Sequence, residues 1–161
     1  MTGYHWLATT VIQVAVRVGD CQGGARVNAF IVDIKNKPGE LAKVAEAIAE
    51  KGIDITGFTG ATCGDTGSVA LITNDEDGTR RALTDGKWTF RPVEMVTASM
   101  ANRPGTLAQV TRKLADAGVN IEAAVPTGMS GGNVHIAFAT DNPTKAKDAL
   151  GEFLLTAAYS V

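Results

Sequence analysis

One short turn sequence occurs twice, and its residue types suit the binding of an anion. The copies are Asn36–Leu41 (Asn-Lys-Pro-Gly-Glu-Leu) and Asn102–Leu107 (Asn-Arg-Pro-Gly-Thr-Leu), which lie 66 positions apart (102 − 36). Each stands before a segment with helical periodicity, where the first backbone N–H groups have no partner within the helix. These groups and the helix dipole favour a carboxylate, by about 0.3–1 kcal/mol for each contribution. The glycine would let a ligand approach the backbone closely.

Polar residues near these turns extend the candidate site. The side-chain amides of Asn36 and Asn102 can donate or accept hydrogen bonds. The ammonium group of an amino acid would need acceptors, which Asp54 and Asn120 offer at the start of the next predicted strand. The predicted ligand-binding residues are Asn36, Pro38, Gly39, Glu40, Leu41, Ile53, Asp54, Asn102, Arg103, Pro104, Gly105, Thr106, Leu107, Val119, Asn120 and Ile121.

The two copies differ in charge at the first helical position. Glu40 already supplies a negative charge in copy one, where it would compete with or repel a ligand carboxylate. Copy two has the neutral Thr106 at that position and Arg103 nearby. We therefore expect the site built on Gly105 to bind an anionic group better, and copy one to be mainly structural.

A purely structural interpretation of both turns stays open. Pro-Gly before a helix is also a good turn, and Asn is a good helix cap. Residues 57–67 hold four glycines but lack the Lys-Ser/Thr of a phosphate-cradling loop, so we expect no phosphate binding there.

The side chains offer little for catalysis. The two histidines, His5 and His135, leave few options for acid–base chemistry, and we expect His135 to be an exposed or interface residue. The two cysteines, Cys21 and Cys63, lack the spacing of a metal or redox pair. We expect no catalytic residues, no metal site, no cofactor and no enzymatic activity.

Charge and hydropathy limit the partners. The net charge is −2 and the pI is about 5.6, without the basic stripe that is typical of nucleic-acid binding. The sequence contains no run of 18 consecutive apolar residues, so no membrane-spanning segment is predicted. We expect a cytoplasmic protein with no nucleic-acid or membrane partner.

The turns belong to a longer repeat. Residues 36–55 and 102–121 are identical at 9 of 20 aligned positions. In copy one we predict a strand at Val27–Lys35 and a helix to about Lys51. We then predict a hairpin loop at 57–67, a strand at Ser68–Thr73, and a weak helix broken by Gly78. The predicted core stripe of the first helix is Leu41, Val44, Ala45 and Ile48.

Copy two repeats this plan almost without a linker. The last strand of copy one should run nearly straight into the first strand of copy two, near Trp88 to Met100. The glycines at 128, 131 and 132 predict a hairpin loop one residue longer than in copy one. Asn142-Pro143 predicts a helix start, and Leu154–Ser160 a final strand. The predicted core stripe of its first helix is Leu107, Val110, Thr111 and Leu114.

These patterns predict an α+β fold of two ferredoxin-like βαββαβ modules, each an antiparallel sheet with its helices on one face. We expect an N-terminal extension at 1–25 with an extra strand at 9–18, module one at 26–91 and module two at 92–161. Modules of this size bury only about 60% of the surface that the unfolded chain exposes, so each should be stabilised by packing against the other module or a second chain.

The two turns, followed by Gly52-Ile-Asp-Ile55 and Gly118-Val-Asn-Ile121, resemble the ACT domain, a small ligand-sensing module. The resemblance covers about residues 26–161 and implies a stand-alone tandem ACT protein. It implies binding of a small molecule, usually an amino acid, at an interface between modules, and allosteric regulation rather than catalysis.

Two functions follow from this resemblance. The first is a non-catalytic amino-acid sensor that forms a homodimer or higher homo-oligomer through sheet edges or helices. The second is a detached regulatory subunit of an amino-acid biosynthetic enzyme, such as an aspartate kinase or acetolactate synthase, with that enzyme as its partner.

Overall fold

The computed structural model describes residues 27–155, so the predicted strand at 9–18 and most of the predicted strand at 154–160 lie outside it. Its helices and strands, in chain order, are β1 (Val27–Lys35), α1 (Glu40–Ala49), β2 (Ile55–Cys63), β3 (Thr66–Thr73), α2 (Glu76–Asp85), β4 (Phe90–Ala101), α3 (Thr106–Asp116), β5 (Ile121–Ser130), β6 (Asn133–Thr140), α4 (Pro143–Leu150) and the 3-10 helix η1 (Gly151–Phe153). We call the described residues up to 91 module one and those from 92 module two.

The six strands form one antiparallel sheet in the order β2-β3-β1-β4-β6-β5. The long strand β4 joins the modules: its first part pairs with β1, its second part pairs with β6, and Met95 pairs with both. The two modules are therefore connected by one continuous strand, in keeping with the near absence of a linker predicted from the sequence. Each half has the ferredoxin-like order of elements, which confirms the predicted α+β fold class. Of the predicted last strand, Leu154 forms one bridge with Ala98.

Each module has its core between its helices and one face of its half-sheet. Val44 and Ile48 of α1 and Val110 and Leu114 of α3 are fully buried, at the predicted spacing. The core of module one is Phe30, Val32, Val44, Ile48, Ile53, Val69, Leu71, Ala82 and Leu83. The core of module two is Val96, Ala98, Met100, Val110, Leu114, Val119, Phe138, Ala146 and Leu150.

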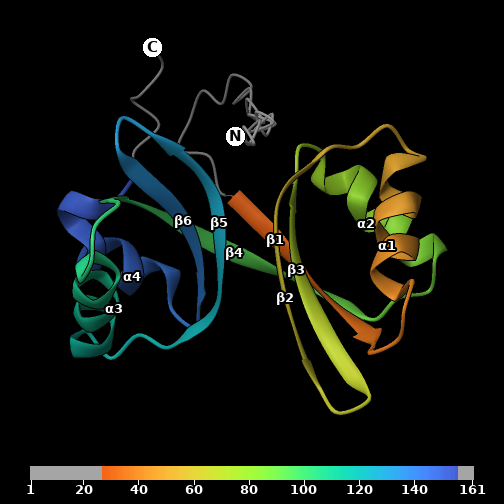
Figure 1. Ribbon diagram of the computed structural model, residues 1–161, viewed down its shortest axis with the longest axis horizontal. Helices are drawn as coiled ribbons and strands as arrows, with labels where there is room; N and C mark the ends of the chain where they lie inside the picture. Colours follow the sequence, from red (N-terminus) through yellow and green to blue (C-terminus); the bar gives the residue numbers. More distant parts are fainter. Residues whose placement is uncertain (1–26, 156–161) are drawn as a thin grey trace, which may run out of the picture.

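The helix-free faces of the two half-sheets pack against each other. The helix pairs therefore lie on opposite outer sides, with the strands between them (Figure 1). The shared cluster is built mainly from small residues: Ala29, Ala70, Ile72, Met95, Val125, Ala137 and Ala139. A Cβ atom at Gly57 would lie 3.2 Å from Val125 Cγ1, so glycine permits this close approach of β2 to β5.

The hairpin predicted at 57–67 is present, but its loop is much shorter than predicted. Strands β2 and β3 extend through most of it, and the turn contains only Gly64 and Asp65. Gly57, Gly60 and Gly67 lie within strands, where contact with neighbouring strands overrides their weak strand propensity. The register of β2 against β3 shifts between Ile55 and Gly57, as it does at a β-bulge.

The longer loop predicted in module two is also wrong. Its turn again contains two residues, Gly131 and Gly132. The additional residue lies in β5, where the register shifts between Pro126 and Gly128 and leaves Thr127 as a bulge. The edge strand of module two therefore has two register shifts, whereas that of module one has one, between Ile55 and Gly57.

Gly78 does not break α2, contrary to prediction. The helix runs without interruption, and Asp75 caps it by accepting a hydrogen bond from the Gly78 N–H at 2.9 Å. A Cβ atom at Gly78 would lie 2.3 Å from Asp75 Oδ2 and 2.7 Å from Ile53 Cδ1. Glycine is needed here because the helix start packs tightly against β2.

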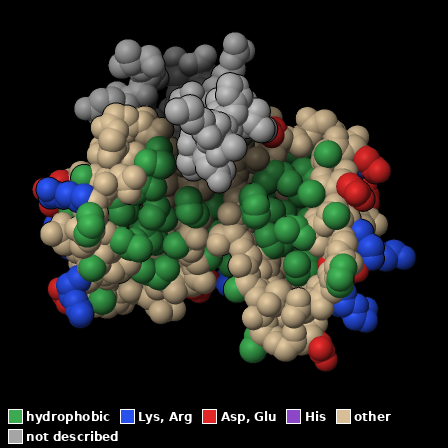
Figure 2. Space-filling view, in the orientation of Figure 1, with side chains coloured by type: hydrophobic (Ala, Val, Ile, Leu, Met, Phe, Trp, Pro, Cys, Tyr) green, Lys and Arg blue, Asp and Glu red, His purple; other side chains and the backbone are tan. Residues whose placement is uncertain are grey.

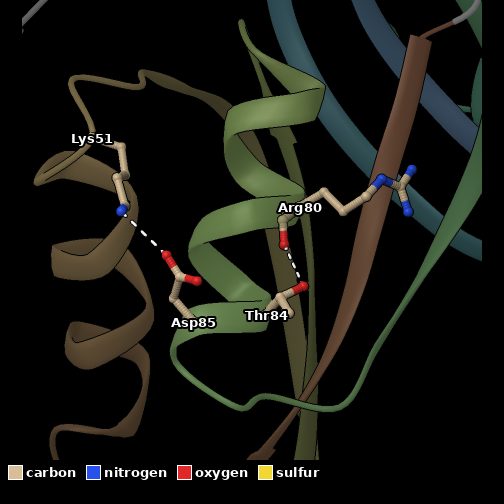
Figure 3. Close-up of polar contacts among 4 residues, drawn as sticks. All are labelled: Lys51, Arg80, Thr84 and Asp85. Carbon is tan, nitrogen blue, oxygen red and sulfur yellow. Dashed lines mark hydrogen bonds and ion pairs between the residues drawn. The ribbon is translucent and has the colours of Figure 1, made fainter.

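An exposed ion pair joins the two helices of module one. Lys51 Nζ lies 3.2 Å from Asp85 Oδ2, while Thr84 Oγ1 donates back to the Arg80 carbonyl (Figure 3).

None of the helices between residues 27 and 155 is long and apolar enough to span a membrane.

Candidate functional site

The duplicated turns have the same backbone conformation. Gly39 has φ +88° and ψ −12°, and Gly105 has φ +89° and ψ −18°, so both occupy the left-handed region that glycine favours. Each glycine is the N-cap of its helix, and a Cβ atom built on either would meet nothing within 4 Å. Space is therefore open in front of both helix ends.

The helices α1 and α3 begin without a side-chain cap, whereas α2 and α4 have one. Asp75 accepts from Gly78 N–H at the start of α2, and Asn142 accepts from Lys145 N–H at the start of α4. No side chain of the described residues makes such a bond at α1 or α3. The N–H groups of Glu40 and Thr106 donate to the Lys37 and Arg103 carbonyls of the turns, so the N–H groups that are available to water or to an anionic ligand are those of the next two residues of each helix.

The asparagines of the turns are not helix caps, contrary to the structural interpretation. The Asn36 side-chain amide donates to the Gly64 carbonyl at 2.9 Å, which fixes the turn to the β2–β3 hairpin. The backbone N–H of Asn36 donates to Asp65, and that of Asn102 donates to Gly132. The asparagines therefore hold each turn against its neighbouring hairpin.

The Glu40 carboxylate of copy one is paired with a neighbouring cation. Glu40 forms an ion pair with Lys43 at 2.6 Å. The hydrogen bond from Lys43, together with the charges of Lys43, Lys35 and Lys37, lowers the pKa of the Glu40 carboxyl below its usual value. Three lysines thus surround one carboxylate, and the turn of copy one carries a net positive charge.

Copy two has an uncharged first helical residue and one nearby cation. Thr106 is 4% exposed, and its buried Oγ1 has no hydrogen-bond partner among residues 27–155. Arg103 is exposed and makes no ion pair within the described part of the chain. Copy two therefore has fewer positive charges than copy one.

The leucines of the turns are not core residues, contrary to prediction. Leu41 is 42% exposed and Leu107 is 51% exposed, because each begins its helix at the outer edge of the sheet. In module one, Leu41 lies with Phe58 of β2 in a groove of about 460 Å³. Asn36, Lys37 and Gly39 line the same groove, so it joins the copy-one turn to an apolar wall.

Phe58 was missed by the sequence analysis because the predicted loop at 57–67 hid the alternation of β2. It is 60% exposed and pairs with Leu71, so it lies on the helix side of the sheet. The position that matches Phe58 in module two is Ala124, which pairs with Phe138, whereas the exposed apolar residue of that edge strand is Met129, which is 64% exposed and pairs with Val134 nearer the hairpin turn. An exposed apolar residue on the edge strand was the signal that could have found both.

The predicted residues at the start of β2 and β5 lie far from the turns of their own modules. The turns lie where β1 and β4 end, whereas Asp54 and Asn120 stand just before β2 and β5. The 9 residues of β2 separate them, about 25–30 Å at 3.3 Å per residue. Asp54 N–H donates to Asn74, and Asn120 N–H donates to Asp141. One small ligand cannot touch both ends within one module.

The remaining predicted residues divide between surface and core. Pro38 and Pro104 are exposed in the turns, whereas Ile53 is 7% exposed and Val119 is 5% exposed. Ile121 is half-buried against the core of module two. These three aliphatic residues are packing residues in this structure. His135 is half-buried, and its Nε2 lies 2.8 Å from Ser130 Oγ.

Comparison with protein families and known structures supports the fold. Residues 95–150, which lie in module two, match the model of the ACT domain family. The comparison with curated proteins found no match.

Several solved structures are similar to the whole described chain. Protein BT0572 from Bacteroides thetaiotaomicron is 27% identical, with a TM-score of 0.71, over 83% of this chain and 94% of that one. The regulatory subunit of aspartate kinase from Thermus thermophilus is 20% identical, with a TM-score of 0.57, over 80% and 91% of the two chains. A C-terminal regulatory domain of aspartate kinase from Porphyromonas gingivalis, described as putative in that structure, is 23% identical, with a TM-score of 0.51, over 85% and 100%.

Proposed function

We propose that this protein is a non-catalytic, allosteric sensor that binds a small carboxylate ligand, an amino acid, at an interface between ACT-like modules. Module one is then the second ACT-like copy of a tandem pair. The observation that carries the proposal is the pair of uncapped helix starts at Gly39 and Gly105, beside two helices of similar length that are capped.

The ligand carboxylate would accept from the second and third N–H groups of α1 or α3, since the first donates to the turn in each helix. Leu41 and Phe58 provide an apolar wall beside the turn of copy one, against which a ligand side chain would pack. The ammonium group would need an acceptor such as Asp54 or Asn120. Because these residues lie at the far end of β2 or β5, a second module has to supply them.

The need for a second module supports a homodimer or higher homo-oligomer. We propose that this oligomer is cytoplasmic. Both sheet edges, β2 and β5, pair on one side only. The exposed Leu41, Phe58, Leu107 and Met129 lie beside these edges. In this orientation, Figure 2 shows hydrophobic side chains gathered on both halves of the molecule.

A thermal-shift screen with the twenty amino acids tests the function. A ligand at 100 times its dissociation constant adds about 2.7 kcal/mol of stability, which is a rise in Tm of about 5–10 °C for a chain of this size. The double variant Gly39→Asn/Gly105→Asn is the control, since asparagine tolerates the left-handed region and its side chain would fill the open space before each helix. The proposal fails if no amino acid raises the Tm of the wild-type protein.

A second candidate is a detached regulatory subunit of an amino-acid biosynthetic enzyme. The observation in its favour is that this chain spans 91% of the Thermus thermophilus aspartate kinase regulatory subunit. A pull-down from native extract that recovers an aspartate kinase or acetolactate synthase catalytic subunit would support it. Recovery of this chain alone, under conditions that retain such complexes, would favour the free-standing sensor.

A further inference from the structure

The loop after α2 contains the one residue other than glycine, among residues 27–155, that has a positive φ. The helices α1, α2 and α3 end alike, because two consecutive backbone N–H groups at each end donate back to the last turn. The left-handed position of this motif is Gly52 after α1 (φ +72°) and Gly118 after α3 (φ +67°). After α2 it is Lys87 (φ +59°), and this conformation strains any residue that has a Cβ atom.

The glycine of this loop stands one position earlier, at Gly86, and it serves a different purpose. Gly86 has φ −76°, which any residue can adopt. A Cβ atom at Gly86 would overlap the Trp88 ring, so glycine is needed there to let the indole lie against the backbone. The loop therefore fixes the position of Trp88 and keeps Lys87 in a strained conformation.

Lys87 and Trp88 line a cleft of about 720 Å³ at the end of β1. The loop from α2 to β4 runs beside this end of β1, where the Thr89 carbonyl accepts from the Asp33 N–H at 2.9 Å (Figure 1). Residues at the tip of the β2–β3 hairpin line another side of the cleft. Trp88 is half-buried against the core of module one, so it offers a fixed apolar surface. A cleft of this volume suits a small organic molecule.

The charges that line the cleft favour an anion. Lys35 and Lys87 belong to none of the ion pairs formed between residues 27 and 155. Glu40 also lines the cleft, but its carboxylate is paired with Lys43. Asp33 is the remaining carboxylate, and it lies two residues before Lys35 on the same face of β1, so it offsets one of the two lysines. One positive charge thus remains uncompensated.

Module two has no counterpart of this arrangement. The segment that matches the loop, residues 151–155, contains neither lysine nor tryptophan. It begins with the 3-10 helix η1 instead, and the nearby Lys113 Nζ lies 5.4 Å from the centroid of the Phe153 ring. The combination of a strained lysine and an indole is therefore specific to module one.

We propose that this cleft binds a small organic anion, with its phosphate or carboxylate group between Lys35 and Lys87 and its ring or apolar body against Trp88. Backbone strain persists where a function requires the side chain that it positions. The site uses no N–H group of a helix start and needs no second module. It is therefore separate from the ligand site at the duplicated turns and goes beyond the proposed function.

Tryptophan fluorescence tests the site directly, because the chain has two tryptophans, Trp6 and Trp88. In a Trp6→Phe background the signal comes from Trp88 alone. The probes are AMP, which carries a phosphate group and a ring, benzoate, which carries a carboxylate and a ring, and inorganic phosphate. We expect AMP or benzoate to change the fluorescence saturably, and the one that binds more tightly identifies the anionic group. Inorganic phosphate should bind at least about tenfold more weakly, because it has no body to pack on the indole.

Lys87→Gly should change stability and binding in opposite directions. It should raise the Tm by about 2–4 °C, because glycine relieves the left-handed strain. It should also raise the dissociation constant of the probe at least about tenfold, because a contact to a charged group is lost. Lys87→Arg keeps the cation and should retain the affinity, whereas Lys35→Ala should weaken binding as Lys87→Gly does.

Lys51→Ala is the matched control, since Lys51 is an exposed lysine of the same module that does not line the cleft. It should leave the dissociation constant unchanged, and circular dichroism verifies that each variant is folded. The inference is overturned if neither AMP nor benzoate changes the fluorescence saturably, or if inorganic phosphate binds as tightly as they do. A Lys87→Gly variant with an unchanged dissociation constant, or with a lower Tm than the parent, also overturns it.

Discussion

Modules one and two share their element order and the conformation of their turn glycines, but they differ at the outer edge of the sheet. Module one has an edge strand that is regular from Gly57 to Cys63 and includes Gly60, an exposed Phe58, and a cluster of lysines at the turn. Module two has Pro126, the bulge at Thr127 and an uncharged Thr106. These differences lie at the sheet edge and the turn, which are the two features that form the candidate site.

The largest expected effect concerns whether the two modules unfold together or separately. Leu83 of α2 and Leu150 of α4 occupy equivalent, fully buried positions in the two cores. Because the modules share β4 and a packed cluster, we expect Leu83→Ala and Leu150→Ala each to lower the stability of a single unfolding transition by about 2–5 kcal/mol. Calorimetry measures this. Two separate transitions, with each variant shifting one of them, would show that the modules are independent.

The sequence predicted the central elements well and the edges poorly. The strand at Val27–Lys35, the start of both turn helices and the cap at Asn142 are confirmed, because hydrophobic periodicity and turn residues are local signals. The exposure of Leu41 and the strand residues Gly57 and Gly60 were not predictable from local pattern. Packing between β2 and β5 and the open sheet edge determine them, and both are long-range features.

The candidate site was predictable as two turns but not as a geometry. The repeat identified Gly39 and Gly105, whose open, left-handed conformations the structure confirms. The pairing of Glu40 with Lys43 was not predicted, because it depends on the rotamers of both side chains. The distance between Asp54 and the turn depends on the direction of β2, which no local pattern gives.

A second comparison concerns a threonine at the end of β3 and β6. Thr73 Oγ1 lies 2.7 Å from Thr79 Oγ1, and Thr79 donates to the Asp75 carbonyl. In module two Ala146 replaces this second threonine, and the buried Oγ1 of Thr140 has no partner among the described residues.

The same substitution should therefore have opposite effects in the two modules. We expect Thr140→Val to raise the free energy of unfolding by about 1 kcal/mol, because it removes an unpaired buried hydroxyl. Thr73→Val should lower it by about 1 kcal/mol, because it removes a hydrogen bond. Urea unfolding of both variants measures the difference, and changes of the same sign would contradict the account.

The smallest expected change in the free energy of unfolding comes from removing the ion pairs between the helical segments. Module one has Lys51–Asp85 at 3.2 Å (Figure 3), and module two has Lys113–Glu152 at 3.3 Å. All four side chains are at least 45% exposed, so we expect Asp85→Asn and Glu152→Gln each to cost less than about 1 kcal/mol. Urea unfolding in low and high salt measures this, and a larger loss at either site would show an interaction that the exposed geometry does not explain.

We propose that, of the two duplicated turns, the one at Gly39 holds the ligand, because three lysines lie near it and it adjoins the apolar groove of Leu41 and Phe58. Isothermal titration with the amino acid that raises the Tm most tests this claim directly by counting ligands per chain. The account predicts one ligand per chain, with binding lost in Gly39→Asn and retained in Gly105→Asn. Two ligands per chain, or a loss confined to Gly105→Asn, would contradict it.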